Sequence, residues 1–99
     1  MAVFEALADE TRRSIVELLA ERERSVAEIT SHFKLSQPAI SKHLRVLRDA
    51  GLARSEVDGK CRIYRLQSEG LLNAEAWFAR NRARWERRLD ALQRHIEEA

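Results

Sequence analysis

The stretch SQPAISKHLRVLRDAGL, Ser36–Leu52, decides the fold because it carries the signals of one complete helix. Ser36 is a typical N-cap, and Pro38 stands in the first turn, where its missing amide hydrogen is not needed. Gly51 is placed to end the helix. Apolar residues recur between these signals at four- and three-residue spacing, which puts them on one face. They are Ile40, Leu44 and Leu47.

The opposite face of this helix is small, polar and basic. It presents Ser41, Lys42 and Arg45, with Gln37 at the front end. Amide, hydroxyl and cationic side chains are the groups that hydrogen-bond base edges and phosphates in the major groove of DNA. The helix therefore has an apolar back that suits a protein core and a front that suits DNA.

Composition limits the class of protein. A chain of 99 residues makes one domain with a thin core, to which a partner subunit often adds burial. Hydrophobic residues are 44% and charged residues 34%, which suits a folded helical domain. With no apolar run of membrane-span length and no signal-peptide pattern, we expect a cytoplasmic protein. A single cysteine, Cys61, excludes an internal disulfide and a multi-cysteine metal cage.

Charge is unevenly distributed along the chain. Residues 25–66 hold eight Lys and Arg against four Asp and Glu. Residues 1–24 hold four against six, and residues 67–99 hold six against six. A local basic excess is typical of a polyanion-binding surface, although four surplus charges also suit an ordinary solvated face.

Three shorter helices precede the quoted one. We expect them near residues 3–8, 10–22 and 26–33. Asp9 is placed to cap the second, and Ser25 with Glu28 forms a capping box at the start of the third. Because only a short turn separates the third helix from Ser36, the segment at about 26–50 fits a helix-turn-helix.

After Gly51 the apolar period changes from that of a helix to that of a strand. LARSEV and CRIYRL alternate around Asp58-Gly59, a strong signal for a β-hairpin. We expect Leu52, Ile63 and Leu66 to face the core, and Lys60 and Arg62 to lie near the tip. A hairpin is marginal alone, so this one, at about 52–66, should pack on the helices as a wing.

The remaining residues, about 68–98, form one long amphipathic helix, which at ~1.5 Å per residue spans about 45 Å. Its apolar residues repeat every seven, a seam too large for the rest of the chain to cover. We predict a homodimer in which this helix and the first, about 2–8, pack across the two-fold axis. The alternative is a helix folded back on its own body. The predicted interface residues are Phe4, Leu7, Trp77, Phe78, Trp85, Leu89 and Leu92.

The segments LADETRRSIVELL and SQPAISKHLRVLRDAGL, followed by a basic hairpin, resemble the ArsR-type winged-helix repressors of bacteria. The resemblance runs from Phe4 to about Leu92. It implies one domain, 1–99, that is mainly α with a small β-hairpin: a winged helix-turn-helix with a long C-terminal dimerisation helix. It also implies a dimer that binds double-stranded DNA at an operator and represses until an inducer, often a metal ion, releases it.

The metal sites of this family can be compared with the sequence position by position. A Cys-x-Cys pair in the helix before the turn falls on Ser25 and Ala27, which supply no thiolate. A second site of the family takes two pairs of ligands from the last helix. His95 and Glu98 match one pair, but the positions of the other pair hold Arg82 and Arg84. Two cations there would repel a metal ion. We therefore expect no metal and no cofactor. No residue pattern in the sequence identifies the inducer.

The predicted DNA-contact residues lie on the helix at Ser36 and on the wing. Gln37 suits adenine, and Ser41 suits a base edge or a phosphate. His43 lies at the edge of the apolar stripe and either bonds a phosphate or packs. Arg12 and Arg13 begin the second helix, where a phosphate contact and an ion pair with a nearby acid suit them equally. The predicted set is Gln37, Pro38, Ala39, Ser41, Lys42, His43, Arg45, Lys60 and Arg62.

Other function classes fit the sequence less well. No nucleophile, base or phosphate loop converges in the motifs, so we expect no enzyme. A winged-helix module that binds protein would need apolar anchors on the exposed face of its helix, where this chain has polar and basic residues. A DNA-binding activator remains an alternative to a repressor, because the sign of regulation depends on where the operator lies.

Overall fold

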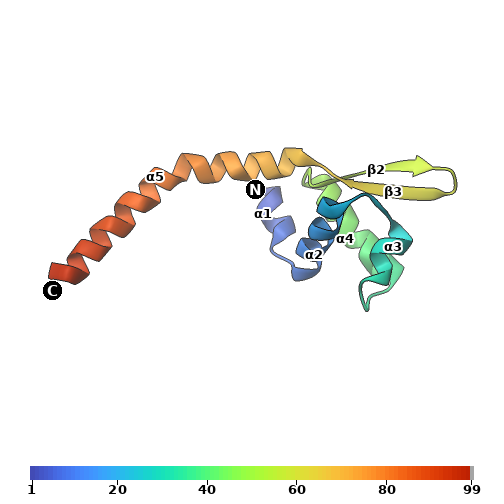
Figure 1. The fold of residues 1–99 in the computed structure, drawn as a ribbon, viewed down its shortest axis with the longest axis horizontal. Coiled ribbons are helices and arrows are strands. Elements are labelled where there is room, and N and C mark those ends of the chain that lie inside the picture. Colours follow the sequence, from blue (N-terminus) through green and yellow to red (C-terminus); the bar gives the residue numbers. More distant parts are fainter. Residues whose placement is uncertain (99) are drawn as a thin grey trace.

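The computed structural model describes residues 1–98. In chain order the elements are α1 (Ala2–Leu7), α2 (Glu10–Glu21), β1 (Arg24–Ser25), α3 (Val26–Ser31), α4 (Gln37–Asp49), β2 (Ala53–Asp58), β3 (Cys61–Leu66) and α5 (Ser68–Glu98). The fold is mainly helical with one small antiparallel sheet, as the sequence predicted (Figure 1). None of the helices in the described part combines the length and apolar character needed to cross a membrane.

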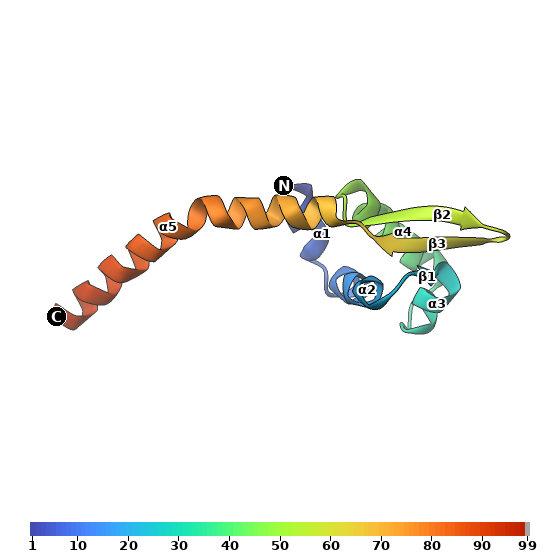
Figure 2. The same ribbon diagram turned by 45° about the horizontal axis from the view of Figure 1, so that its top comes forward.

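The core lies between α2, α3 and α4 on one side and the sheet on the other (Figure 2). Its centre is the apolar back of α4, where Ile40, Leu44 and Leu47 are fully buried. Ile15 of α2 and Ile29 of α3 are also fully buried. The residues that sequence periodicity placed on the inner face of α4 thus anchor that helix to the body.

The sheet has the strand order β1-β3-β2, and all its pairs are antiparallel. The short strand β1 was not predicted, because two residues are too few to show a period; Arg24 pairs with Tyr64 of β3. The prediction that Ile63 faces the core was wrong: Tyr64 is buried, and Ile63 is only half-buried. Leu66, two residues from Tyr64 and so on the same face of the strand, packs against the core as predicted, whereas Ile63 lies on the other face.

Gly51 ends α4, as the sequence predicted. Its φ of 72° is in the left-handed region, and the amide of Leu52 donates to the carbonyl of Leu47 at 2.9 Å. This closes the helix with a Schellman-type bond. The start of α5 then packs closely on this turn, since the amide of Gly70 donates to the carbonyl of Gly51 at 2.8 Å. A Cβ on Gly70 would lie 2.5 Å from the carbonyl oxygen of Ala50, which leaves no room for a larger residue.

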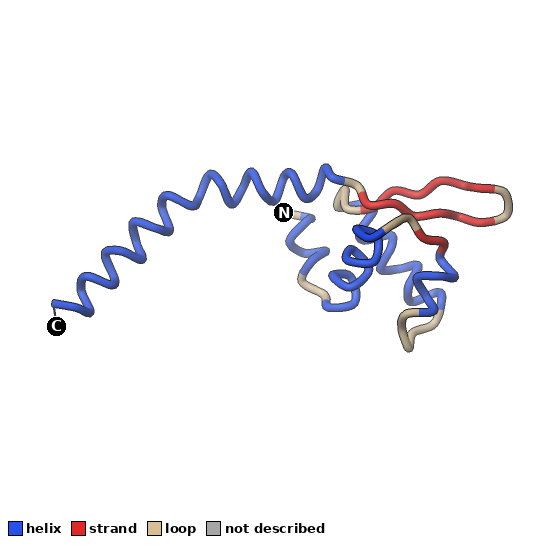
Figure 3. Tube along the Cα trace, in the orientation of Figure 1, coloured by secondary structure: helices blue, strands red, loops and turns tan. Residues whose placement is uncertain are grey.

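The hairpin turn lies one residue later than predicted. Asp58 pairs with Cys61, so the two loop residues are Gly59 and Lys60. Gly59 has a φ of 63°, and a glycine with positive φ at the first loop position is typical of a type II′ turn. This turn places Lys60 in the loop at the tip of the hairpin. The loop joins the two long strands at the end away from the helices (Figure 3).

The helix α5 leaves the body rather than folding back on it (Figures 1 and 3). Its buried residues, Gly70 and Ala74, both lie in its first two turns. The molecule measures 65 × 26 × 21 Å, and its radius of gyration is 18.2 Å. A compact chain of this length would have a radius of gyration of about 13 Å. The C-terminal part of α5 is therefore an arm without tertiary packing in its own chain.

Candidate nucleic-acid interface

The helix α4 presents the polar face that the sequence predicted. The Oγ of Ser36 accepts a hydrogen bond from the amide of Ala39 at 3.3 Å, which fixes where the helix begins. Gln37, Ser41 and Arg45 are all exposed. Because the back of the helix is buried in the core, this face points away from the body.

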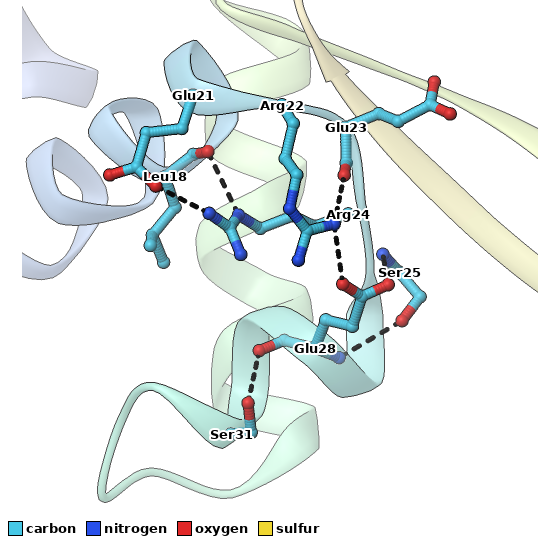
Figure 4. Close-up of polar contacts among 8 residues, drawn as sticks. All are labelled: Leu18, Glu21, Arg22, Glu23, Arg24, Ser25, Glu28 and Ser31. Carbon is cyan, nitrogen blue, oxygen red and sulfur yellow. Dashed lines mark hydrogen bonds and ion pairs between the residues drawn. The ribbon is translucent and has the colours of Figure 1, made fainter.

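The N-terminus of α3 is fixed by a reciprocal capping box (Figure 4). The Oγ of Ser25 accepts from the amide of Glu28 at 3.1 Å, and the amide of Ser25 donates to Oε1 of Glu28 at 3.3 Å. That amide, together with the Arg22 guanidinium 3.1 Å from Oε2, holds the pKa of Glu28 below its ordinary value. The predicted capping box is confirmed.

Arg24 connects this region to the sheet. Its side chain is 6% exposed, and its Nε donates to the carbonyl of Leu18 at 3.1 Å while Nη2 donates to Oε2 of Glu21 at 2.8 Å (Figure 4). The guanidinium thereby satisfies a carbonyl near the end of α2. Because Arg24 also pairs with β3, it ties the helices to the wing.

The wing, the β2–β3 hairpin at residues 53–66, carries cations on its surface. Arg62 donates to the Oγ of Ser55 at 3.0 Å, and Nη1 of Arg48 lies 3.5 Å from the same oxygen. Ser55 thus joins the wing to the C-terminal end of α4. Arg65 lies at the base of the wing, where its Nε is 2.7 Å from Oε2 of Glu23.

A groove of about 460 Å³ lies between α4 and the wing. Four of the predicted DNA-contact residues meet in it: Gln37 and Ser41 from α4, and Lys60 and Arg62 from the wing. Sequence reasoning missed its other lining residues, which are Ser25, Val26, Ala27, Cys61 and Tyr64. The charge pattern gave no signal for these, since they are uncharged and come from the start of α3 and from β3.

The other predicted residues of α4 lie outside this groove. Lys42 and Arg45 surround a shallow depression of about 220 Å³, which they share with Ser41 at the border of the groove. Pro38 is exposed and Ala39 half-buried in the first turn. The structure therefore brings the cations of α4 and those of the wing to two neighbouring surfaces.

His43 lies on a third side of α4, against α2. Its side chain is 22% exposed, and its Nδ1 lies 3.3 Å from Nη1 of Arg12 and 3.9 Å from Oδ2 of Asp9. This placement favours the packing alternative. In place of the predicted ion pair with a nearby acid, the guanidiniums of Arg12 and Arg13 both donate to backbone carbonyls at the end of α1, and the phosphate contact stays a prediction.

The predicted interface residues form a half-exposed surface. The rings of Phe4, Trp77, Phe78 and Trp85 pack with centroids 5.2 to 5.8 Å apart, which joins α1 to α5. Leu7 is half-buried, while α1 buries Val3 and Ala6 more deeply. Further along the arm, Leu89 and Leu92 are exposed.

The donor set at the family's metal positions does not fit a metal ion. Ser25 and Ala27 line the groove without a thiolate. His95 and Glu98 stand on the arm, about three and four turns beyond Arg84. Within residues 1–98, no three His, Cys, Asp or Glu side chains come together in a group that could hold a metal.

Comparison with known proteins identifies the family. Residues 9–55 match the model described as bacterial regulatory protein, arsR family. The HTH-type transcriptional regulator YuzN of Bacillus subtilis (strain 168) is 42% identical over 79 residues, which cover 73% of this chain and 86% of that protein. The transcriptional repressor SdpR of the same organism is 35% identical over 76 residues, 77% of this chain and 84% of the relative.

The solved structures agree with the sequence relatives. An ArsR-like transcriptional regulator from Rhodococcus sp. RHA1 superposes with a TM-score of 0.81 at 34% identity, over 99% of this chain and 90% of that one. The relatives and the structural neighbour are transcriptional regulators, so the groove between α4 and the wing belongs to a DNA-binding protein and not to an enzyme. The chain belongs to the arsR family of bacterial regulatory proteins, with a winged helix-turn-helix fold.

Proposed function

We propose that the chain is a single-domain, homodimeric repressor that binds an inverted-repeat operator. The observation that carries this proposal is the groove of about 460 Å³, where Gln37 and Ser41 of α4 face Lys60 and Arg62 of the wing. A helix front that can read bases and a hairpin that can bind phosphates share one surface. This is the arrangement by which a winged helix straddles a DNA backbone.

Each proposed contact follows from side-chain chemistry and position. Gln37 forms a bidentate pair with adenine, and Ser41 reaches a base edge or a phosphate. Lys42 and Arg45, on the outer side of α4, neutralise phosphates or pair with guanine. Lys60 and Arg62 meet the backbone or the minor groove. Pro38 and Ala39 approach a thymine methyl group, and His43 supports the helix from behind.

The proposed dimer is supported by the surface of α5. An apolar seam, made of Phe78, Trp85, Leu89, Leu92 and Ile96, runs along one face of the arm and is exposed along its length. An apolar stripe of this size on a helix needs a covering partner. In a two-fold dimer the two copies of α4 would lie about 34 Å apart, one turn of DNA, which requires an inverted repeat.

The proposed repressor does not respond to a metal ion. This part of the proposal rests on the side chains at the family's metal positions, where Ser25 and Ala27 provide no thiolate and arginines stand at 82 and 84. Its signal is then a small molecule or a protein.

A titration tests the proposal. The purified protein is added to its own upstream DNA and to a scrambled duplex, at two salt concentrations, with zinc or with a chelator. We expect tight binding to the upstream DNA, weaker binding to the scrambled duplex, a loss of affinity with salt, and no effect of zinc. Equal and weak binding to both duplexes would refute sequence-specific readout and favour a protein-docking role for α4. Release from DNA by zinc would refute metal independence.

A further inference from the structure

We propose that Arg12 is a positioning residue for DNA readout, which couples the N-terminal helix α1 to the recognition helix α4 through His43. The proposal rests on the proposed function, in which α4 reads DNA. One guanidinium connects two elements that are otherwise held together by apolar contacts. Such a polar contact has a direction, so it fixes how the two helices are turned toward each other.

The guanidinium is held at the end of α1 by two hydrogen bonds. Its Nε donates to the carbonyl of Ala6 at 2.7 Å, and its Nη2 donates to the carbonyl of Glu5 at 3.1 Å. These carbonyls belong to the last turn of α1, where helix carbonyls lack their usual partners four residues on; that of Glu5 also accepts from the amide of Ala8 at 3.3 Å. The planar guanidinium therefore has little freedom once these bonds are made.

The third nitrogen of the same group reaches α4. Nη1 lies 3.3 Å from Nδ1 of His43. Because a guanidinium can only donate, Nδ1 is the acceptor in this hydrogen bond. Asp9 closes the arrangement: its carboxylate accepts from the amide of Arg12 at 3.0 Å, a bond that lowers the pKa of Asp9, and lies 3.9 Å from Nδ1.

The position of His43 on α4 makes this contact relevant to readout. His43 follows Lys42 directly and is two residues from Ser41, on a different side of the helix from both. The apolar back of α4 packs in the core, and such contacts tolerate small rotations of a helix better than a directional hydrogen bond does. We infer that the Arg12–His43 contact sets the rotation of α4 about its axis, and with it the aim of the exposed side chains.

The other end of the contact lies beside the proposed dimer surface. Phe4 of α1 packs against Trp77 and Phe78 of α5, with ring centroids 5.2 and 5.6 Å apart. If the partner subunit shifts α1, the Arg12 side chain connects that shift directly to the recognition helix α4.

The chain contains a matched control. Arg13 follows Arg12 and donates from Nη1 to the carbonyl of Leu7 at 2.9 Å, so it caps the same end of α1. Within residues 1–98, this is the one hydrogen bond that the Arg13 side chain makes, and it makes none to α4. Arg12→Ala and Arg13→Ala each remove a cation that caps α1, with two carbonyl bonds lost in the first and one in the second, and only the first removes the link to His43.

The test compares variants in operator binding, with a scrambled duplex measured alongside. We expect Arg12→Ala to lower operator affinity and selectivity about tenfold, the size of one lost hydrogen bond between positioned groups. Arg13→Ala should stay within about twofold of the parent. His43→Leu, which removes the acceptor, should match Arg12→Ala, and the double variant should be no worse than either. His43→Asn, whose side-chain oxygen replaces Nδ1, should recover most of the affinity although asparagine is the poorer helix former.

The possible outcomes separate the two proposals. Equal losses in Arg12→Ala and Arg13→Ala, or additive losses in the double variant, would overturn the positioning role and leave both arginines as caps of α1. His43→Asn behaving like His43→Leu would overturn it as well, and this pair decides the matter if Arg12→Ala fails to fold. A parent protein that binds neither duplex would instead refute the proposed function, and the positioning role with it.

Discussion

The apolar seam of α5 predicts that a leucine far from the DNA surface controls dimer stability. Leu92 is 57% exposed in the protomer, so truncating it to alanine leaves no cavity in the folded chain. In the proposed dimer the partner subunit covers this side chain. The substitution should therefore weaken association and leave the fold of each protomer unchanged.

The size of the effect follows from the exposed fraction. Burying a whole leucine side chain is worth about 1.5–3 kcal/mol. Covering the exposed 57% of Leu92 in both subunits is then worth about 2–3 kcal/mol per dimer. This corresponds to an increase of about 30- to 150-fold in the dimer dissociation constant of Leu92→Ala.

The same helix offers a control of equal exposure. Leu72 is 59% exposed, but helical periodicity places it on another face of α5, away from the seam. Sedimentation equilibrium over a dilution series gives the dissociation constant of each variant, and circular dichroism checks that the helix content is kept. Leu92→Ala and Leu72→Ala dissociating at the same concentration would refute the seam as the dimer interface.

Further predictions concern the DNA surface and the aromatic cluster. Gln37→Ala combined with Ser41→Ala should cost about 1–3 kcal/mol per lost base contact, measured as a loss of selectivity in competition titrations; unchanged selectivity would contradict base readout by these residues. Arg62→Ala should weaken binding to all sequences alike and lower the slope of log affinity against log salt by about one, whereas a loss confined to one sequence would indicate a base contact. Trp85→Ala removes two aromatic pairs, each worth about 0.5–1.5 kcal/mol, and should lower both the unfolding midpoint and the dimer stability; a dimer as stable as the parent's in sedimentation would argue against its place in the seam. Bound operator should slow alkylation of Cys61, which lines the groove; equal rates by mass spectrometry with and without DNA would place the duplex elsewhere.

The features that sequence reasoning predicted well depend on short-range chemistry. Ser36 and Gly51 delimit α4 because capping and positive φ are decided within a few residues of each terminus. The capping box of Ser25 and Glu28 is equally local. The apolar spacing of α4 predicted its buried face, because a helix with one apolar stripe has one way to meet a core.

The features that it missed depend on contacts between distant segments. Strand β1 exists because Arg24 finds Tyr64 across the sheet, and that pairing also decides that Tyr64 and not Ile63 faces the core. The role of Arg12 escaped prediction for a similar reason. Its sequence neighbours include acids that suit an ion pair, but its guanidinium reaches back to α1 and across to His43. A charged residue in a sequence predicts that its side chain needs polar partners, but the fold decides which groups those partners are.

Dimerisation and DNA binding should be linked in free energy, because α1 is part of the proposed dimer surface and is connected through Arg12 and His43 to α4. The arm of α5 lacks packing in its own chain, and isolated helices are only marginally stable in water. A partner that covers the seam stabilises the arm and, through Phe4, fixes α1. Because Arg12 is bonded to both α1 and His43, the position of α1 then affects the position of His43. Because such coupling is reciprocal, operator DNA should tighten the dimer by the same factor by which dimerisation tightens DNA binding. Leu92→Ala, which touches no proposed DNA contact, should therefore lose operator affinity at protein concentrations below its dimer dissociation constant and regain it above. Unchanged operator affinity below the dimer dissociation constant would show that the seam and the recognition helix act independently.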